Sequence, residues 1–276
     1  MSEEIYRKSG SRRSRLGTSF GRSPSAMDWK QRRYVCMGLA MISVVCFVLA
    51  GVMGWKFFHR YSEGVAIYNQ VRELVPDFEI EMSEGSGGER STMDFSSLLE
   101  MNPDCIGWIQ IPGTDIDYPI VQGADNTQYL REAFTGDASD LGSIFADYRN
   151  DSDFMDDNTV LYGHDMWVGG SMFSQLTNYQ DMSFFNEHPE ILIHTLDGRL
   201  LRYQVFAVRI VDETDSDAYT RMFESDSQNL EYLSDIVSDA LYDTMERPED
   251  GQSLLTLSTC TNVRDSERLL VHGVLK

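Results

Sequence analysis

The residues best suited to chemistry lie near the end of the sequence, at Cys260 and Arg268. Cys260 closes the apolar, β-prone run LLTLSTC, and Arg268 opens the next such run, RLLVHGVL. A cysteine is nucleophilic as its thiolate, which a basic or cationic neighbour favours. A guanidinium on the adjacent strand would offer a planar set of donors to oxygen atoms. The pattern therefore indicates nucleophilic cysteine chemistry.

His164 is the best candidate for the base in such a site. It ends the run NTVLYGH and precedes the loop DMWVGGSM. Catalytic side chains often occupy strand ends beside loops. The other histidines lie at the end of an apolar segment, in a polar loop or inside strands: His59, His188, His194 and His272.

A disulfide is the alternative explanation of Cys260. Cys105 is the other cysteine outside the apolar N-terminal segment, and an extracellular pair can oxidise. Cys36 and Cys46 lie inside that segment and are explained as apolar filler. No CxxC or HxxxH spacing occurs, which argues against a metal site. We expect neither a metal nor a cofactor.

The charged residues are unevenly distributed along the chain, whose net charge at pH 7 is -21. Residues 1–33 carry nine Lys and Arg against three acidic residues. Residues 61–276 carry 12 Lys and Arg against 41 acidic residues. An acidic body lacks the basic face that nucleic acid requires, so we expect no nucleic-acid partner.

An apolar run separates the basic tail from the acidic body. Residues 34–55 contain no charged residue, and a helix of that length spans about 33 Å, close to the hydrocarbon core of a bilayer. A cleaved signal peptide would have a shorter apolar run and a small-residue cleavage site. Arg32 and Arg33 precede the run, so the positive-inside rule predicts a single-pass protein of the cell membrane. Its N-terminus would be cytoplasmic, its acidic body extracellular and its span surrounded by membrane lipid.

Composition divides the chain into four parts. A basic cytoplasmic tail covers residues 1–33, and the transmembrane signal anchor covers residues 34–55. Residues 56–93 are predicted to form a juxtamembrane helix and a flexible linker, because a helical apolar pattern gives way to SEGSGGERS. Residues 94–276 form the remaining, catalytic domain.

Patterns typical of β-strands dominate this domain. After a short predicted helix, DFSSLLEMNPD, apolar residues alternate with polar ones in CIGWIQIPGTDIDYPIVQG and in later runs. Asp197-Gly198 is a predicted hairpin turn. One helical pattern covers residues 230–245. The number and spacing of strands predict a mostly β fold, an antiparallel β-barrel with helical insertions behind a single N-terminal transmembrane helix.

Several segments resemble those of the sortases, the membrane-anchored cysteine transpeptidases of Gram-positive bacteria. TLSTC, residues 256–260, followed by Arg268 on the next strand, is similar to the family signature. GWIQIPGTDIDYPIVQG, GSIFADYRN, NTVLYGHDM and GSMFSQL resemble class B segments in the same order. The helix before the last two strands is similar to the long helix of class B members. The resemblance extends from about residue 95 to the end and implies a sortase-like barrel.

The resemblance implies roles for three side chains. Cys260 would be the nucleophile, His164 the general acid and base, and Arg268 the clamp for the oxyanion or the substrate. Chemistry agrees, because an imidazole can protonate a leaving amine and deprotonate an incoming one. The backbone N–H of Thr261 would be a second oxyanion donor.

Five further residues are expected to bind the substrate. Asn126 and Leu130 match family positions that line the groove for the sorting signal. Tyr219 and Thr220 lie in the loop where class B enzymes read the peptide. Ser258 is two residues before the cysteine and therefore points to the same face of its strand. An ordinary structural role is the alternative for each of them.

The resemblance implies that the chain cleaves a C-terminal sorting signal of exported proteins through a Cys260 thioester. It would then transfer them to an amine, either of a peptidoglycan precursor or of a pilin lysine. Two other functions stay open: a membrane-tethered thiol peptidase that releases its product to water, and a non-catalytic extracellular binding module with a Cys105–Cys260 disulfide. An amine-dependent product would exclude the first, and a free thiol would exclude the second.

Overall fold

A computed structural model describes most of the chain: residues 28–75, 80–82, 89–166, 169–260 and 266–276. The chain divides into two compact units, Met1–Gly54 and Trp55–Lys276.

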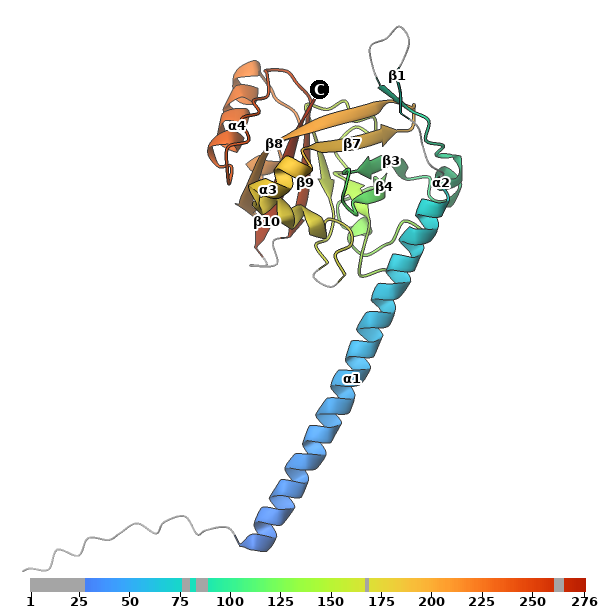
Figure 1. Cartoon of the computed structure of the whole chain (residues 1–276), viewed down its shortest axis with the longest axis vertical. Helices are drawn as coiled ribbons and strands as arrows, with labels where there is room; N and C mark the ends of the chain where they lie inside the picture. The colour runs from blue at the N-terminus through green and yellow to red at the C-terminus, as the bar shows by residue number, and fades with distance from the viewer. Residues whose placement is uncertain (1–27, 76–79, 83–88, 167–168, 261–265) are drawn as a thin grey trace, which may run out of the picture. The chain divides into compact units, whose positions relative to one another are not determined.

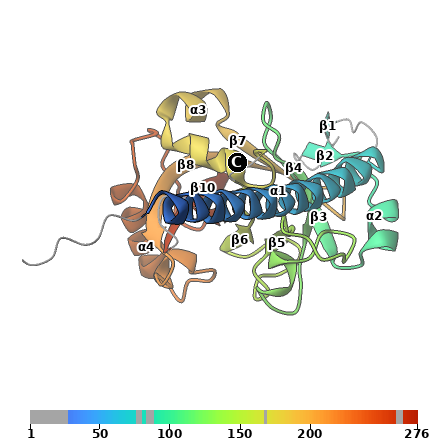
Figure 2. The same cartoon turned by 90° about the horizontal axis from the view of Figure 1, so that it is seen from below.

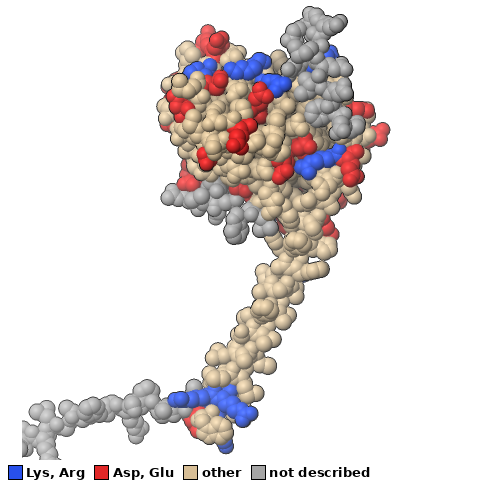
Figure 3. Space-filling model, viewed as in Figure 1, with Lys and Arg blue, Asp and Glu red and all other residues tan. Residues whose placement is uncertain are grey.

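Helix α1 runs from Trp29 to Glu73 without a break. The expected membrane span and juxtamembrane helix are therefore parts of one helix. Among the described helices, α1 is the one long and apolar enough to cross a membrane, by length and composition. Basic residues gather at its beginning and an uncharged stretch follows (Figure 3). These features are consistent with a membrane anchor.

The second unit contains a closed barrel with the strand order β10-β8-β7-β3-β4-β5-β6-β9 (Figures 1 and 2). Its strands are β3 (Cys105–Gln110), β4 (Asp117–Val121), β5 (Ile144–Ala146), β6 (Asn158–Tyr162), β7 (Glu190–Thr195), β8 (Leu200–Asp212), β9 (Leu254–Cys260) and β10 (Glu267–Leu275). The pairs β4–β5 and β6–β9 are parallel, and the other neighbours are antiparallel. The predicted barrel is confirmed.

Alternating side chains of β9 and β10 separate the barrel interior from an outer apolar layer. Leu255 and Val271 belong to the main core. Leu254 and Val274, on the opposite faces of the same strands, pack with residues of helix α4 (Asp226–Ser238). The outer face of β9 and β10 is therefore buried as well, which matters because Cys260 and Arg268 lie on these strands.

The remaining elements are short and connect the strands. They are β1 (Ile80–Met82), β2 (Glu89–Ser91), α2 (Ser96–Met101), α3 (Met182–Glu187) and the 3₁₀ turns η1 (Gln128–Leu130), η2 (Ser174–Gln180) and η3 (Asp217–Tyr219). The predicted linker SEGSGGERS lies partly outside the described residues, but its end, Glu89–Ser91, pairs with β1 as a strand. The expectation of a flexible joint is therefore wrong for these three residues.

Helix α4 is shorter at its C-terminal end than the pattern over residues 230–245 predicts. The helix begins after Ser225, whose hydroxyl accepts a hydrogen bond from the Gln228 N–H at 3.3 Å. It ends at Ser238 because the following backbone binds the barrel: the Leu241 N–H donates to the Val208 carbonyl at 2.8 Å. Tertiary hydrogen bonds therefore outweigh the helical apolar pattern of the last seven predicted residues.

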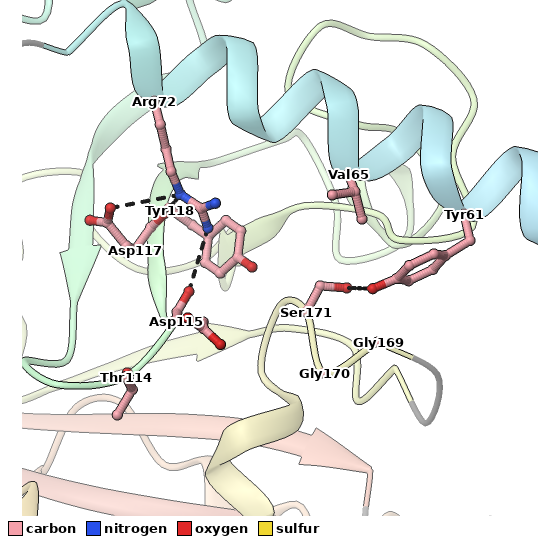
Figure 4. Close-up of a pocket in the computed structure, with 10 residues that line it drawn as sticks. All are labelled: Tyr61, Val65, Arg72, Thr114, Asp115, Asp117, Tyr118, Gly169, Gly170 and Ser171. Atoms are coloured by element: carbon pink, nitrogen blue, oxygen red, sulfur yellow. Dashed lines mark hydrogen bonds and ion pairs between the residues drawn. The ribbon is translucent and has the colours of Figure 1, made fainter.

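The last turns of α1 pack against the barrel (Figure 4). The Tyr68 ring is buried and meets the Tyr118 ring edge-on, with centroids 5.4 Å apart. The Arg72 Nε–H donates to the Asp117 carbonyl at 2.9 Å, and the guanidinium lies over the Tyr118 ring. Tyr61 and Ser171 form a hydroxyl–hydroxyl hydrogen bond of 3.3 Å. These contacts attach the end of α1 to strand β4 and to the loop that carries Ser171.

Candidate active site

Strand pairing brings together the elements that carry the three predicted catalytic positions. Arg268 of β10 lies opposite Cys260 of β9 in an antiparallel pair. In the parallel pair β6–β9, Tyr162 lies beside Ser258, and the Gly163 N–H donates to the Ser258 carbonyl at 3.2 Å. His164 follows the end of β6 by two residues. The strand that carries Cys260 thus lies between the strand that precedes His164 and the strand that carries Arg268.

The structure describes Cys260 by its backbone, and Thr261 lies outside the described residues. The predicted oxyanion donor at Thr261 therefore stays a prediction. Cys105 is a free, buried thiol, and burial raises its pKa to about 12. A disulfide between Cys105 and Cys260 is thus absent, which removes the main support for a non-catalytic module. The high pKa also makes Cys105 a poor nucleophile.

Tight packing of the preceding glycine and one side-chain hydrogen bond fix the position of His164. The Cβ that any other residue would place at Gly163 would come within 2.6 Å of the Phe173 ring, so the preceding glycine lets the chain pass here. The His164 Nε2 lies 2.8 Å from the Leu130 carbonyl. Because a carbonyl accepts only, Nε2 carries a hydrogen, and Nδ1 is the nitrogen that can gain and lose a proton.

Arg268 is held in place by a carboxylate. Its Nη2 donates to Glu213 Oε2 at 2.6 Å, and its Nη1 donates to the Glu267 carbonyl at 3.0 Å. Glu213 follows β8 directly, and its N–H donates to the Ser266 carbonyl at 2.7 Å, which joins the ends of β8 and β10. The guanidinium is therefore oriented before any substrate arrives. No motif in the sequence indicates Glu213 as the partner of Arg268.

A pocket of about 370 Å³ lies between α1 and the barrel (Figure 4), and a larger one of about 570 Å³ lies beside Arg268. Neither His164 nor Arg268 lines the smaller pocket. The larger pocket is lined by Asn126, Leu130, Phe145, Arg149, Tyr162, Glu213, Thr214, Ser216, Tyr219, Ser258 and Arg268. Because it adjoins the strand edge that carries Cys260, this pocket is the candidate substrate site.

Four of the five predicted substrate residues line this pocket: Asn126, Leu130, Tyr219 and Ser258. The Tyr219 and Ser258 hydroxyls are 3.2 Å apart, within hydrogen-bond distance. Thr220 is not among the lining residues. Its hydroxyl donates to the Asp217 carbonyl at 2.9 Å, within the turn η3. Thr220 thus has a structural role in the turn that carries Tyr219.

Asp147 organises one wall of the pocket, a role that sequence reasoning missed. Its side chain is fully buried and accepts hydrogen bonds from Arg149 at 2.7 Å, Asn126 at 2.9 Å and Tyr162 at 3.1 Å. Burial by itself would raise the pKa of Asp147, but the hydrogen bonds from Arg149 and Asn126 outweigh it and lower the pKa to about 2. Asp147 lies in GSIFADYRN, one of the segments that resemble class B sortases, and this resemblance is the sequence feature that could have pointed to it.

The other histidines of the barrel have structural partners. His194 is fully buried, its Nδ1 lies 2.6 Å from the Ser91 hydroxyl, and burial lowers its pKa to about 4. His272 is also fully buried, and burial together with the Arg209 charge lowers its pKa. Within the part of the chain that the structure describes, no group of three or more His, Cys, Asp or Glu could hold a metal ion.

The chain is similar to known proteins over most of its length. The family model described as Sortase domain matches residues 109–276. Sortase B of Listeria monocytogenes is 35% identical over 186 residues, covering 66% of this chain and 74% of the relative. Sortase B of Staphylococcus aureus is 30% identical over 224 residues, covering 80% of this chain and 89% of the relative.

A solved structure of sortase B from Bacillus anthracis agrees with these matches. It superposes with a TM-score of 0.68 at 32% sequence identity, covering 79% of this chain and 98% of that one. The barrel is thus that of known sortases. The chain belongs to the sortase family of cysteine transpeptidases, in class B.

Proposed function

We propose that this chain cleaves a C-terminal sorting signal of exported proteins and transfers them to an amine through a Cys260 thioester. The observation that supports this most is the register that places Arg268 of β10 directly opposite Cys260 of β9. The pocket of about 570 Å³ beside Arg268 is of the size that holds a short peptide segment. The acceptor would be the amine of a peptidoglycan precursor or of a pilin lysine.

Acylation begins with the Cys260 thiolate, which attacks the carbonyl carbon of the scissile peptide bond. The bond between that carbon and the nitrogen breaks as His164 Nδ1 gives its proton to the leaving amine. The product is a thioester between Cys260 and the exported protein. The acceptor amine then attacks the thioester carbon, His164 Nδ1 takes the proton of the amine, and the Cys260 thiolate leaves.

Arg268 would stabilise the negative oxygen of both tetrahedral intermediates. Its guanidinium is already oriented by Glu213 and the Glu267 carbonyl. A donor that is fixed in advance needs no reorganisation when the charge develops, which is why such groups contribute strongly to catalysis. Lysine could keep the charge but not the planar arrangement of donors.

The location that fits this reaction is the outer face of the cell membrane, with residues 34–55 as a single span. Residues 1–33 would be cytoplasmic, and residues 94–276 would be extracellular. Protease added to intact protoplasts should remove the C-terminal domain and leave a protected fragment that contains the basic tail. Protection of the C-terminal domain would contradict this topology.

The test of the function uses the full chain in detergent micelles and a library of sorting-type peptides. Each peptide is incubated with and without a short peptide that carries a free α-amine or a lysine. We expect cleavage of a subset of the library and a ligated product when the amine is present. Cleavage whose product is always the free acid, whatever the amine, would indicate the thiol peptidase instead.

A further inference from the structure

A chain of buried polar side chains crosses the barrel wall beneath α4. Arg209 of β8 donates from Nε to His272 Nε2 of β10 at 3.1 Å. His272 Nδ1 lies 3.0 Å from Thr256 Oγ1 of β9, and that hydroxyl donates to Asn158 Oδ1 of β6 at 2.9 Å. All four side chains are at most 5% exposed. Four strands are thus joined by one continuous line of hydrogen bonds.

The direction of these hydrogen bonds is fixed by chemistry. A guanidinium only donates, so His272 Nε2 accepts and Nδ1 carries the hydrogen that it gives to Thr256. The Thr256 hydroxyl is then free to donate to Asn158 Oδ1. The lowered pKa of His272, caused by burial and by the Arg209 charge, keeps the imidazole in the neutral form that this order requires.

The chain of hydrogen bonds ends on the turn that carries Tyr219. Asn158 Nδ2 donates to the Thr220 carbonyl at 2.7 Å and to the Tyr232 hydroxyl at 3.2 Å. The Tyr232 hydroxyl in turn donates to the Ala218 carbonyl at 3.0 Å. The Thr220 carbonyl is therefore held by barrel strand β6 and the Ala218 carbonyl by helix α4, so both sides of Tyr219 are fixed.

Tyr219 is the residue of this turn that faces the candidate substrate pocket. Its hydroxyl lies 3.2 Å from the Ser258 hydroxyl, and its ring packs against Tyr162 with centroids 5.9 Å apart. Turn η3 has only three residues, and its own backbone hydrogen bonds run from the Tyr219 N–H to the Ser216 carbonyl and from the Thr220 N–H to the Asp217 carbonyl. A fixed backbone on both sides of Tyr219 restricts where the ring can lie.

We propose that Arg209, His272, Thr256, Asn158 and Tyr232 form a buried relay that positions Tyr219 for recognition of the substrate peptide. The relay residues are positioning residues, because they lie behind η3 and none of them lines the pocket. The role of the relay in substrate recognition rests on the proposed function, since Tyr219 contacts substrate only if the pocket binds the sorting signal. The hold on η3 itself does not depend on that function.

Thr159 of β6, next to the relay residue Asn158, supplies a matched control. Thr159 is as buried as Thr256, at 1% and 0% exposure. Among the described residues, however, the Thr159 hydroxyl has no hydrogen-bond partner. Thr256→Val and Thr159→Val therefore make the same chemical change in the same barrel, inside and outside the relay.

The experiment compares these variants as full chains in detergent. Hydrogen exchange of the amides of residues 217–220 is measured by mass spectrometry, and kcat and KM are measured with the library peptide that the wild-type chain cleaves fastest. Thr256→Val should speed exchange in η3 and raise KM about tenfold, with a small change in kcat. Thr256→Ser, which keeps the hydroxyl, should restore both, and Thr159→Val should change neither.

If the amides of η3 exchange at the wild-type rate in the Thr256→Val chain, the relay is overturned. It is also overturned if Thr159→Val changes hydrogen exchange and KM as much as Thr256→Val does. If Thr256→Val does not fold, Asn158→Asp decides the question. This variant keeps the acceptor for Thr256 and removes the donor to the Thr220 carbonyl, so it should reproduce the faster exchange. If the wild-type chain cleaves no peptide, the proposed function fails, while the exchange measurement still decides whether the relay exists.

Discussion

At the scale of single residues, the candidate site combines groups that are held before substrate binds. His164 Nε2 is fixed by the Leu130 carbonyl, and Arg268 is fixed by Glu213. Asp147 fixes Asn126 and Arg149 in the wall of the pocket. Groups that are oriented in advance stabilise a transition state without reorganising during the reaction.

Replacing Arg268 by lysine tests whether its planar donors matter. Arg268→Lys keeps the charge and loses the planar set of N–H donors, so kcat should fall about 10²–10³-fold if the side chain stabilises the oxyanion. Arg202→Lys is a matched control, because Arg202 also pairs with a glutamate at 2.6 Å and has a similar exposure, 29% against 24%. Steady-state kinetics of both variants decide. A nearly wild-type kcat in Arg268→Lys would leave Arg268 as a charge partner only.

Asp147 should make the stability of the fold dependent on pH in the acidic range. Its pKa of about 2 lies below the ordinary value of 3.8, so the carboxylate stabilises the fold above about pH 4. That contribution, on the order of 2 kcal/mol, is lost as the pH falls from about 4 towards 2. Thermal unfolding of Asp147→Asn should show a lower midpoint at pH 7 and a flatter dependence below pH 4.

Asp235→Asn, on the exposed face of α4, is the control for the Asp147 variant and should behave as the wild-type chain does. Equal unfolding midpoints of the wild-type and Asp147→Asn chains at pH 7 would show that the hydrogen bonds to Asp147 do not stabilise the fold.

At the scale of elements, the end of α1 is a structural part of the barrel domain. The Tyr68 hydroxyl donates to the Gly142 carbonyl at 2.5 Å and lies 3.0 Å from the Ser143 hydroxyl. Gly142 has a φ of +59°, and its position leaves little room: an added Cβ would lie 2.7 Å from the Tyr129 carbonyl and 3.1 Å from the His164 ring. The helix thus supports a segment that packs against His164, the predicted catalytic histidine.

Removing the Tyr68 hydroxyl tests this support. Tyr68→Phe should lower the free energy of unfolding by about 1–3 kcal/mol, because the buried Gly142 carbonyl loses its donor. Tyr203→Phe makes the same change at a buried tyrosine whose hydroxyl has no hydrogen-bond partner within the described residues. It should leave the stability unchanged or raise it. Chemical unfolding curves of the two variants at one detergent concentration provide the comparison, and equal losses would contradict the account.

Local sequence patterns predicted the existence of the helices and strands better than the residues at which they begin and end. Alternating apolar residues identified the barrel strands, and the turn at Asp197-Gly198 joins β7 to β8 as predicted. The end of α4 was missed because the hydrogen bond from Leu241 to Val208 joins residues far apart in the sequence. For the same reason the pairing of Glu213 with Arg268 could not be predicted, since register between β8 and β10 decides it.

At the scale of the whole molecule, the sequence separates a basic tail, an apolar span and an acidic catalytic domain. The family resemblance in TLSTC, YGH and the arginine is confirmed by the match over residues 109–276. The roles of Cys260, His164 and Arg268 stay predictions that the register supports. What the motifs could not predict is the pocket wall around Asp147 and the buried relay, because both depend on side chains from separate strands.

The thioester on Cys260 is the central claim, and intact-mass spectrometry of the full chain tests it most directly. The chain is mixed with the peptide that it cleaves fastest, and the reaction is quenched in acid with and without an acceptor amine. We predict an adduct on Cys260 with the mass of the N-terminal peptide fragment, which disappears as ligated product forms when amine is added. Cys105→Ala should form the same adduct, and Cys260→Ala should form none. Cleavage by Cys260→Ala, or turnover with no adduct on Cys260, would contradict the mechanism.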